Sequence, residues 1–289
     1  MLRIWHPIST GRLWHRCLAV PYAVMALAVG PISIAWVAGS GVAHAGAVIH
    51  QTSRDLPDGK PKDDETVYVQ DGMIRSDKLD DRGHPTSVSI FRDGVMWELN
   101  VEQRTYKKLD KAAAQQLGAM SAQMQQRLAS LPPERRAAIE KAMGSAQAAP
   151  PITWAGTGRN EKVAGFACDI WEGKKQATLE YEYCIAQPGA VPHGDEIYAA
   201  LKQMEASLRD AMSAMQGAAG PAAVHATYDT LSWIERAKGY PILRREFSGG
   251  KPYQERAVKS ITTEQLPADK FAIPQGFREV SPMGGHGAE

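Results

Sequence analysis

Between Val48 and Lys108, hydrophobic and polar residues alternate in short runs, a pattern typical of β-strands that bury one face. Two Asp-Gly pairs, Asp71-Gly72 and Asp93-Gly94, each separate two of these runs. Both central residues of a tight hairpin turn need positive φ, which Asp and Gly adopt more readily than most residues. The pattern therefore predicts an antiparallel meander with two β-hairpins.

The spacing of hydrophobic residues changes to three or four in segments 110–146 and 195–216, which predicts amphipathic helices between groups of strands. Pro132-Pro133 divides the first segment into two helices. Its predicted apolar face consists of Ala113, Leu117, Met120, Met124, Leu128 and Leu131. The face of the second segment consists of Ile197, Leu201, Met204, Leu208 and Met212. Gly, Ala and Pro in segment 217–223 predict the end of that helix.

Strand-like runs return in segments 152–186 and 240–262. In the first of these, turns are predicted at 158–160 and 173–175, and Gly165 is interpreted as a bulge or a close contact. A hairpin about the second turn would bring Cys168 close to Cys184, as a disulfide requires. Helices inserted between groups of antiparallel strands predict an α+β domain.

Residues 1–45 follow a different pattern. Three arginines and no acidic residue accompany a long apolar run from Cys17 to Ala38, which is followed by a short segment that ends in Ala43-His44-Ala45. These features are typical of a secretory signal peptide that is cleaved after Ala45, with Ala43 at the −3 position. The apolar run is also just long enough to span a bilayer, so an uncleaved inner-membrane tether is the alternative. The expected location is the periplasm.

Loss of the signal segment changes what the composition implies. The whole chain has 33 Lys and Arg against 32 Asp and Glu, and the segment removes three of the arginines. The slightly acidic remainder lacks the positive field that attracts nucleic acid, so no nucleic-acid partner is expected. Of the three cysteines, Cys168 and Cys184 remain, and such a pair in an oxidising compartment predicts a disulfide.

Several short motifs follow one another along the chain. They are Tyr68-x-x-Asp71-Gly72-Met73-Ile74-Arg75, Phe91-x-Asp93-Gly94-x-Met96-Trp97-x-Leu99, Thr105-Tyr106, Gly165-Phe166-x-Cys168-x-Ile170-Trp171, Gly239-Tyr240-Pro241-Ile242 and Leu266-Pro267-x-x-x-Phe271-x-Ile273-Pro274-x-Gly276-Phe277. In this order, over roughly residues 48–280, they resemble the DUF4412 family of bacterial exported proteins.

That family is similar to the LolA/LolB-like lipoprotein carriers. The resemblance therefore implies a curved antiparallel sheet, an incomplete β-barrel, with the inserted helices against its concave face. It also implies a hydrophobic cavity between sheet and helices. The single domain is expected to span residues 46–281, and residues 282–289 are expected to form a disordered tail.

Large apolar side chains of the motifs and helices are expected to line this cavity: Trp97, Trp171, Leu117, Met120, Met124, Met204 and Leu208. Ordinary helix core and Cu(I) binding are alternative interpretations of the methionines. No metal site is expected, because no histidines have zinc-type spacing. The pair Arg244-Arg245 is interpreted either as part of a solvated face or as a holder of a lipid headgroup at the pocket rim.

The predicted function is non-catalytic binding of a lipid or another hydrophobic small molecule, by a monomer that needs no cofactor. The alternative is an envelope protein or stress-response factor that binds a protein partner and has a filled core. An enzyme is not expected, because the serines lack a nucleophile elbow and the histidines are widely spaced.

Overall fold

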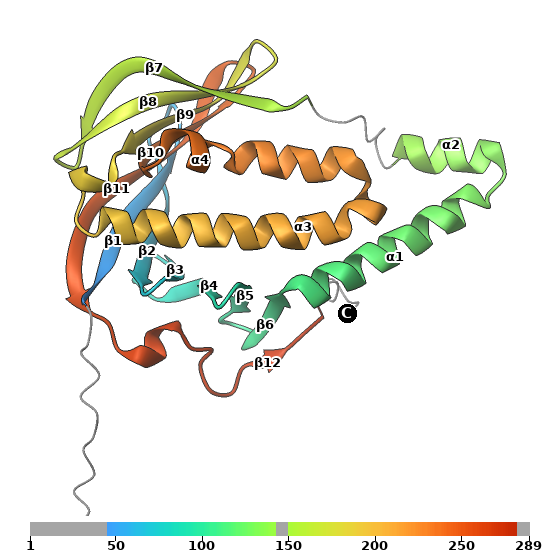
Figure 1. Ribbon diagram of the computed structural model, residues 1–289, viewed down its shortest axis with the longest axis horizontal. Coiled ribbons are helices and arrows are strands. Elements are labelled where there is room, and N and C mark those ends of the chain that lie inside the picture. Colours follow the sequence, from blue (N-terminus) through green and yellow to red (C-terminus); the bar gives the residue numbers. More distant parts are fainter. Residues whose placement is uncertain (1–44, 143–149, 282–289) are drawn as a thin grey trace, which may run out of the picture. The chain divides into compact units, whose positions relative to one another are not determined.

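The computed structural model describes residues 45–142 and 150–281 (Figure 1). The predicted cleavage residue Ala43 and the tail 282–289 lie outside the described residues, whereas Ala45 is the first residue of the first strand. Of the described helices, none combines the length and the hydropathy that a membrane span requires.

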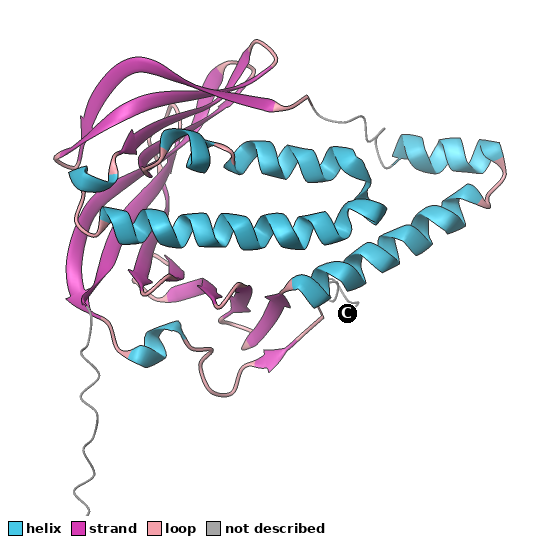
Figure 2. Cartoon of the chain, in the orientation of Figure 1, coloured by secondary structure: helices cyan, strands magenta, loops and turns pink. Residues whose placement is uncertain are grey.

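Within the described residues, twelve strands form one curved, unclosed sheet (Figures 1 and 2). The strands are β1 (Ala45–Asp55), β2 (Pro61–Gln70), β3 (Met73–Leu79), β4 (Pro85–Arg92), β5 (Val95–Asn100), β6 (Thr105–Leu109), β7 (Ile152–Val163), β8 (Phe166–Lys175), β9 (Thr178–Ala186), β10 (Tyr240–Ser248), β11 (Lys251–Gln265) and β12 (Arg278–Glu279). The helices are α1 (Lys111–Ala129), α2 (Pro133–Ala142), α3 (Gly194–Leu231) and α4 (Trp233–Ala237), with 3₁₀ turns η1 (Pro188–Ala190) and η2 (Ala268–Phe271).

Two meanders make up the sheet, whose strand order is β12-β6-β5-β4-β3-β2-β1-β11-β10-β9-β8-β7. Strands β1 to β6 form the first meander and β7 to β11 the second, and the antiparallel pairing of β1 with β11 joins them. Among the described strands, β12 alone pairs in parallel, with β6. The predicted antiparallel sheet is confirmed.

Both predicted Asp-Gly hairpins are confirmed. Asp71 and Gly72 have φ of 51° and 76°, and Asp93 and Gly94 have φ of 52° and 75°. These turns connect β2 to β3 and β4 to β5 through two-residue loops, as the paired strand ends require.

The turns of the second meander differ from the prediction. Ala164 and Gly165, both with positive φ, form the turn between β7 and β8, so Gly165 is not a bulge. The predicted turn at 158–160 is instead an irregularity within β7, where the register shifts between Gly156 and Asn160. The predicted turn at 173–175 lies within β8. A glycine is needed at 173 because a Cβ there would lie 2.9 Å from the ring of Trp154.

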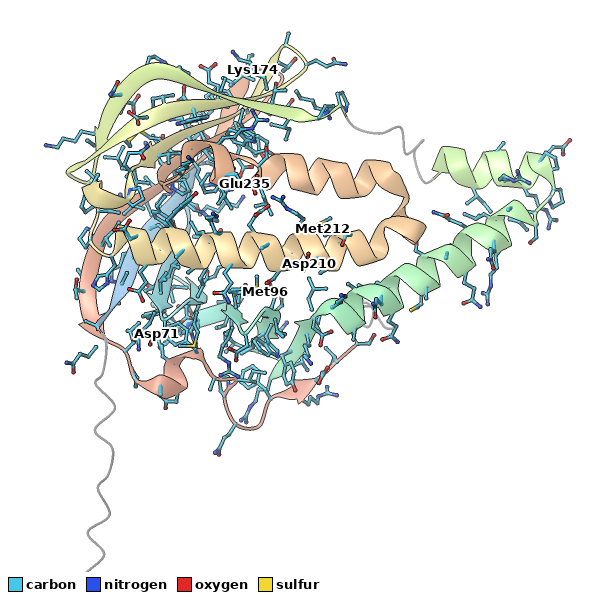
Figure 3. All side chains as sticks on the ribbon, viewed as in Figure 1. Asp71, Met96, Lys174, Asp210, Met212 and Glu235 are labelled. Atoms are coloured by element: carbon cyan, nitrogen blue, oxygen red, sulfur yellow. A yellow bond between two sulfur atoms is a disulfide. The ribbon has the colours of Figure 1, made fainter. Side chains whose placement is uncertain are left out.

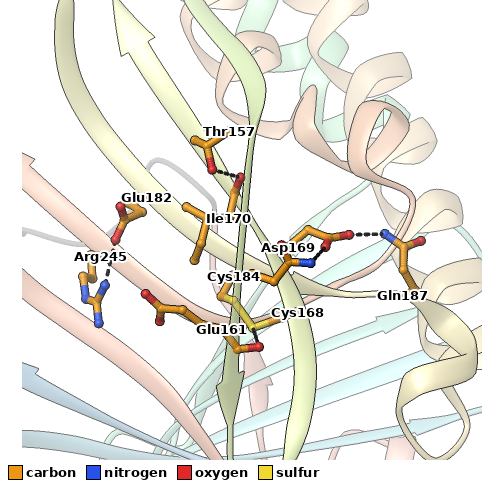
Figure 4. Close-up of a disulfide and its surroundings, with 10 residues drawn as sticks. Thr157, Glu161, Cys168, Asp169, Ile170, Glu182, Cys184, Gln187 and Arg245 are labelled. Atoms are coloured by element: carbon orange, nitrogen blue, oxygen red, sulfur yellow. Dashed lines mark hydrogen bonds and ion pairs between the residues drawn. A yellow bond between two sulfur atoms is a disulfide. The ribbon is translucent and has the colours of Figure 1, made fainter.

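The disulfide between Cys168 and Cys184 is present, as predicted, across the β8–β9 hairpin (Figure 4). The two Cα atoms are 5.2 Å apart, and both side chains are buried in the main core cluster. That cluster also contains Ile197 and Ala200 of α3, so the disulfide lies within the layer where the sheet packs against this helix.

Helix α3 continues beyond the predicted end at Gln216 and doubles back (Figure 1). Its 38 residues would extend about 57 Å as a straight helix. However, the Tyr198 hydroxyl near its beginning donates to the carbonyl of Ile234, just beyond its end, at 3.4 Å. Arg209 likewise pairs with Glu235 of α4 at 3.1 Å. The reversal brings α4 back to the sheet.

Helix α1 packs against α3 and β6 rather than against the middle of the sheet. Its buried residues are Ala114 and Gly118, not the predicted Leu and Met positions. Small residues allow two helices to approach closely, because interaxial distance depends on the side chains at the contact. Asp110 caps this helix: its Oδ1 accepts from the Ala113 amide at 2.8 Å.

The opposite face of the sheet is covered by the segment that follows β11. Leu266 and Phe271 pack on Val48, and Ile273 and Phe277 pack near Leu99. Two arginines hold the segment as well: Arg75 donates to the Lys270 carbonyl at 2.9 Å, and Arg92 to the Phe271 carbonyl at 3.3 Å. The sheet is therefore buried on both faces over part of its area.

Candidate functional site

A cavity of about 250 Å³ lies between the sheet and helices α3 and α4. Its volume is just below the ~300–1,000 Å³ of typical small-molecule pockets. The lining residues come from β1 to β5, β9 to β11, α3 and α4: Gln51, Glu65, Val67, Ile74, Ser76, Ser89, Phe91, Met96, Tyr183, Leu201, Met204, Leu231, Trp233, Ile234, Tyr240, Pro241, Arg244 and Arg256.

Most of this lining is apolar, because strand pairing aligns hydrophobic residues in a row. Ile74 lies opposite Phe91, and Phe91 lies opposite Met96, across β3, β4 and β5. Leu201 and Met204 of α3 face this row. Figure 3 shows Met96 next to α3. Such walls favour an apolar occupant, since burial removes its surface from water.

Polar groups of the cavity converge on Glu65. Its carboxylate accepts hydrogen bonds from Gln51 at 2.8 Å and from the Ser76 hydroxyl, and it pairs with Arg256 at 2.8 Å. Arg256 also donates to Ser53 Oγ at 3.0 Å. Glu65 is thus neutralised and bonded by its neighbours, as a buried carboxylate must be.

Arg244 also lines the cavity, but it lacks such partners. It lies directly opposite Tyr183 of β9 and Arg256 of β11 in the strand register. Its guanidinium carbon is 5.0 Å from the centroid of the Tyr183 ring. Arg244 Nε and the Tyr183 hydroxyl are both buried, and neither has a hydrogen-bond partner among the described residues.

Four aromatic residues form a cluster beside Arg244, and two of them, Tyr183 and Trp233, line the cavity. The rings of Trp154 and Tyr183 are 4.7 Å apart, and those of Tyr183 and Trp233 are 5.6 Å apart in an edge-to-face arrangement. Tyr181 completes the cluster. Burial raises the pKa of Tyr183, so its phenol remains neutral and can donate a hydrogen bond.

The next residue, Arg245, belongs to the other face of the sheet. Its Nη1 donates to Glu182 at 2.7 Å and its Nε donates to Glu255 at 2.8 Å. Alternation along β10 therefore separates the Arg244-Arg245 pair. One arginine lines the cavity, and the other forms ion pairs outside it.

Two of the predicted lining residues lie at or near the cavity. Met204 lines it. Leu208, one helical turn further along α3, lines a much smaller hollow together with Phe91 and Met96.

Neither predicted tryptophan lines the cavity. Trp97 lies on the opposite face of the sheet, because it is adjacent to the cavity residue Met96, and it packs with Val88 and Ile90. Trp171 shares the face of Tyr183 but packs against Gly156 and the aromatic cluster. Alternation along β5 places Trp97 on the opposite face. Trp171 lies away from the cavity because β8 is next to the edge strand β7.

The predicted residues of α1 also lie away from the cavity. Met120 and Met124 are 44% and 58% exposed, and Leu117 is partly buried. These three residues are not among those that line the cavity, because α1 contacts β6 and α3 only at the side of the sheet.

Sequence reasoning missed the cavity residues Glu65, Tyr183 and Trp233, and it left Arg244 with two interpretations. Trp233 follows the reversal of α3, and the Gly, Ala and Pro of segment 217–223 predicted only the end of a helix, not its return to the sheet. Glu65 and Tyr183 lie in strands whose facing depends on register. The adjacent arginines were the available signal, because alternation on a strand must direct them to opposite faces.

A second, larger hollow of about 440 Å³ lies near the β4–β6 side of the sheet. It is lined mainly by polar residues, among them Ser87, Asn100, Gln103 and Lys107. Within the described residues, no group of three or more His, Cys, Asp or Glu side chains is placed to hold a metal ion.

The chain matches no family model and no curated protein. Solved structures give only distant similarity. An uncharacterised conserved protein from Thermus thermophilus aligns with a TM-score of 0.41 and 9% identity, over 82% of this chain and 90% of that one. The structure of PNGF-II aligns with a TM-score of 0.38 and 7% identity, over 82% of this chain and 31% of that one. The Pseudomonas aeruginosa MucA/MucB complex aligns with a TM-score of 0.34 and 12% identity, over 78% of this chain and 54% of that one. Similarity at this level assigns neither a family nor a function.

Proposed function

We propose that this protein binds an apolar small molecule or a lipid chain in the cavity between the sheet and helices α3 and α4, without catalysing a reaction. The observation that carries the proposal is the lining itself. Ile74, Phe91 and Met96 of the sheet face Leu201 and Met204 of α3 across this space. Each square ångström of apolar ligand surface buried there contributes about 25 cal/mol.

The hydroxyl groups of the cavity support binding rather than chemistry. Ser76 donates to Glu65, and Ser89 donates to Glu98 at 3.1 Å. In a Ser-His-Asp triad the base that accepts the serine proton is a histidine, whereas Ser76 and Ser89 donate to carboxylates, and that of Glu65 is already ion-paired with Arg256. We therefore assign Ser76 and Ser89 to the structure of the strands.

The proposed place of action is the periplasm, on the basis of the signal-like segment 1–45. The helices of the proposed carrier would cover the concave face of the sheet, as the DUF4412 resemblance implies. A shielded apolar site suits a compartment in which lipids and other apolar molecules must cross water.

The test uses the mature protein purified from the periplasm. Native mass spectrometry should detect a co-purified apolar ligand, and a fluorescent apolar probe should bind and be displaced by added lipid. Met204→Trp, which fills part of the cavity, should weaken probe binding by roughly tenfold. Met124→Trp is the matched control, because Met124 is exposed on α1. Absence of both ligand and probe binding, or equal loss in the two variants, would contradict the proposal.

A second candidate function is binding of a protein partner through α1. Met120 and Met124 are exposed on the side of this helix away from its buried residues Ala114 and Gly118. Exposed methionines are common at protein-binding surfaces. The double variant Met120→Lys/Met124→Lys should then abolish an in-cell photocrosslink to an envelope protein, whereas Gln123→Lys on the same helix should not. An unchanged crosslink would exclude this surface.

A further inference from the structure

The cavity contains two arginines but only one carboxylate partner for them. Arg244 and Arg256 lie directly opposite each other on β10 and β11, and both line the cavity. Like charges in directly opposed positions are destabilising. Arg256 is compensated by Glu65, whose carboxylate is 2.8 Å away.

Arg244 has no such compensation. Within the described residues it forms no ion pair, and its Nε is buried without a hydrogen-bond acceptor. Glu246 lies two positions along the same strand, but its carboxylate accepts from the Tyr253 hydroxyl at 2.6 Å. A guanidinium remains charged at every working pH, and an uncompensated charge beside an apolar cavity is costly.

Tyr183 adds a second donor at the same place. Its side chain is 0% exposed, its hydroxyl has no partner among the described residues, and its ring lies 5.0 Å from the Arg244 guanidinium. A guanidinium and a neutral phenol side by side supply N–H and O–H donors, and neither group carries a negative charge itself. This is the donor set that binds a carboxylate or phosphate oxygen.

We infer that the ligand is an anionic amphiphile, with its carboxylate or phosphate head at Arg244 and Tyr183 and its apolar chain along Phe91, Met96 and Met204. This inference rests on the proposed function, since the chain needs the apolar cavity. The inference adds to the proposed apolar ligand a head group with a negative charge. The occupant then supplies the negative charge that the site lacks.

Three probes of equal chain length separate the head from the chain: dodecanoate, dodecyl phosphate and dodecanol, each measured by displacement of a fluorescent apolar probe from the mature protein. At least one of the two anions should bind roughly tenfold or more tightly than dodecanol. Preference for dodecanoate indicates a fatty-acid head, and preference for dodecyl phosphate indicates a phospholipid head.

Arg244→Gln should remove this preference and leave dodecanol binding unchanged, and Tyr183→Phe should reduce it by about threefold. Arg244→Lys, which keeps the positive charge, should retain part of the preference for the anionic probes. Arg245→Gln is the matched control: it removes the same charge from the adjacent residue, which pairs with Glu182 and Glu255 on the other face. Thermal melting of each variant shows that it is folded.

Equal binding of dodecanol and both anions by the unmodified protein would overturn the inference and leave the proposed function standing. Equal loss of anion preference in Arg244→Gln and Arg245→Gln would overturn it too. Absence of binding by all three probes would instead refute the proposed function, and the inference with it. If Arg244→Gln does not fold, the inference is still tested by the preference of the wild-type protein for anions over dodecanol and by the part of that preference that Arg244→Lys retains.

Discussion

Arg245 and Glu182 form an ion pair of 2.7 Å between β10 and β9, at the centre of a row of charges that crosses five neighbouring strands. Strand register places Glu172, Glu182, Arg245, Glu255 and Arg54 opposite one another in turn. The row alternates in sign from Glu182 to Arg54. It connects the second meander to β1 on the face away from the cavity.

The first prediction concerns acid stability. Burial acts to raise the pKa of Glu182, but hydrogen bonds from Arg245 and Arg159 outweigh it and hold the pKa below its ordinary value of 4.5. The ionised carboxylate therefore stabilises the fold above that value, and this contribution is lost as the pH falls through the lower pKa of the folded state. Glu182→Gln should reduce the free energy of unfolding near pH 7 by about 1–3 kcal/mol.

The difference between Glu182→Gln and wild type should shrink as the pH falls below about 4.5, measured by urea denaturation at several pH values. Glu180→Gln is the control, because Glu180 lies on the same strand outside the row. A pH-independent difference would show that ionisation of Glu182 is not the cause.

The second prediction concerns the disulfide. The double variant Cys168→Ala/Cys184→Ala removes a cross-link over a sequence separation of 16 residues. By loop-closure entropy we expect a loss of about 2–4 kcal/mol in the free energy of unfolding. Denaturation of wild type with and without reductant should give the same difference. An identical midpoint for the reduced and oxidised proteins would contradict the expectation.

The third prediction concerns the aromatic cluster that contains Trp154 and Tyr183. In Gly173→Ala, the new methyl group would lie 2.9 Å from Trp154, whose ring contacts Tyr183 at 4.7 Å. The ring must move, and such overpacking costs about 1–3 kcal/mol. Thermal melting and near-UV circular dichroism should both change. Gly189→Ala should change neither, because no atom lies within 4 Å of a Cβ there.

The fourth prediction concerns the contact of α1 with α3. Ala114 is fully buried, so Ala114→Leu should separate the two helices and speed amide exchange in α1. Met120→Leu should leave exchange unchanged, since Met120 is 44% exposed. Equal protection in both variants would mean that the buried residues Ala114 and Gly118 do not hold α1 against α3.

The fifth prediction concerns the mature N-terminus. Cleavage after Ala45 would make Gly46 the first residue, with β1 otherwise intact from its second position. Intact-mass measurement of the exported protein should show this terminus, and Ala43→Lys should block processing. A mass that includes residues 1–45 would establish the tethered form instead.

The local parts of the fold were predictable from sequence, because their signals are local. Asp71-Gly72 and Asp93-Gly94 specify their turns through positive φ, and Cys168 and Cys184 lie within one hairpin. The turn at Ala164-Gly165 was misplaced, because Gly158 and Gly173 gave competing signals of the same kind.

The cavity was only partly predictable, because its walls depend on which face of the sheet each side chain occupies. Met96 and Trp97 are adjacent and both apolar, so no polar neighbour marks the buried face, and Trp97 was assigned to the wrong one. The exposed Met120 and Met124 show a different limit. A stripe of large apolar residues on a helix does not identify the contact face when small residues beside it permit closer packing.

The pairing of β1 with β11 has a consequence for the order in which the chain folds. Strand β1 (residues 45–55) pairs with β2 on one side and with β11 (residues 251–265) on the other. The middle of the sheet therefore joins the two ends of the domain. A chain that emerges N-terminus first must keep one edge of β1 unpaired until almost all of the domain has followed. Throughout that interval, β1 depends on the first meander alone or on a chaperone.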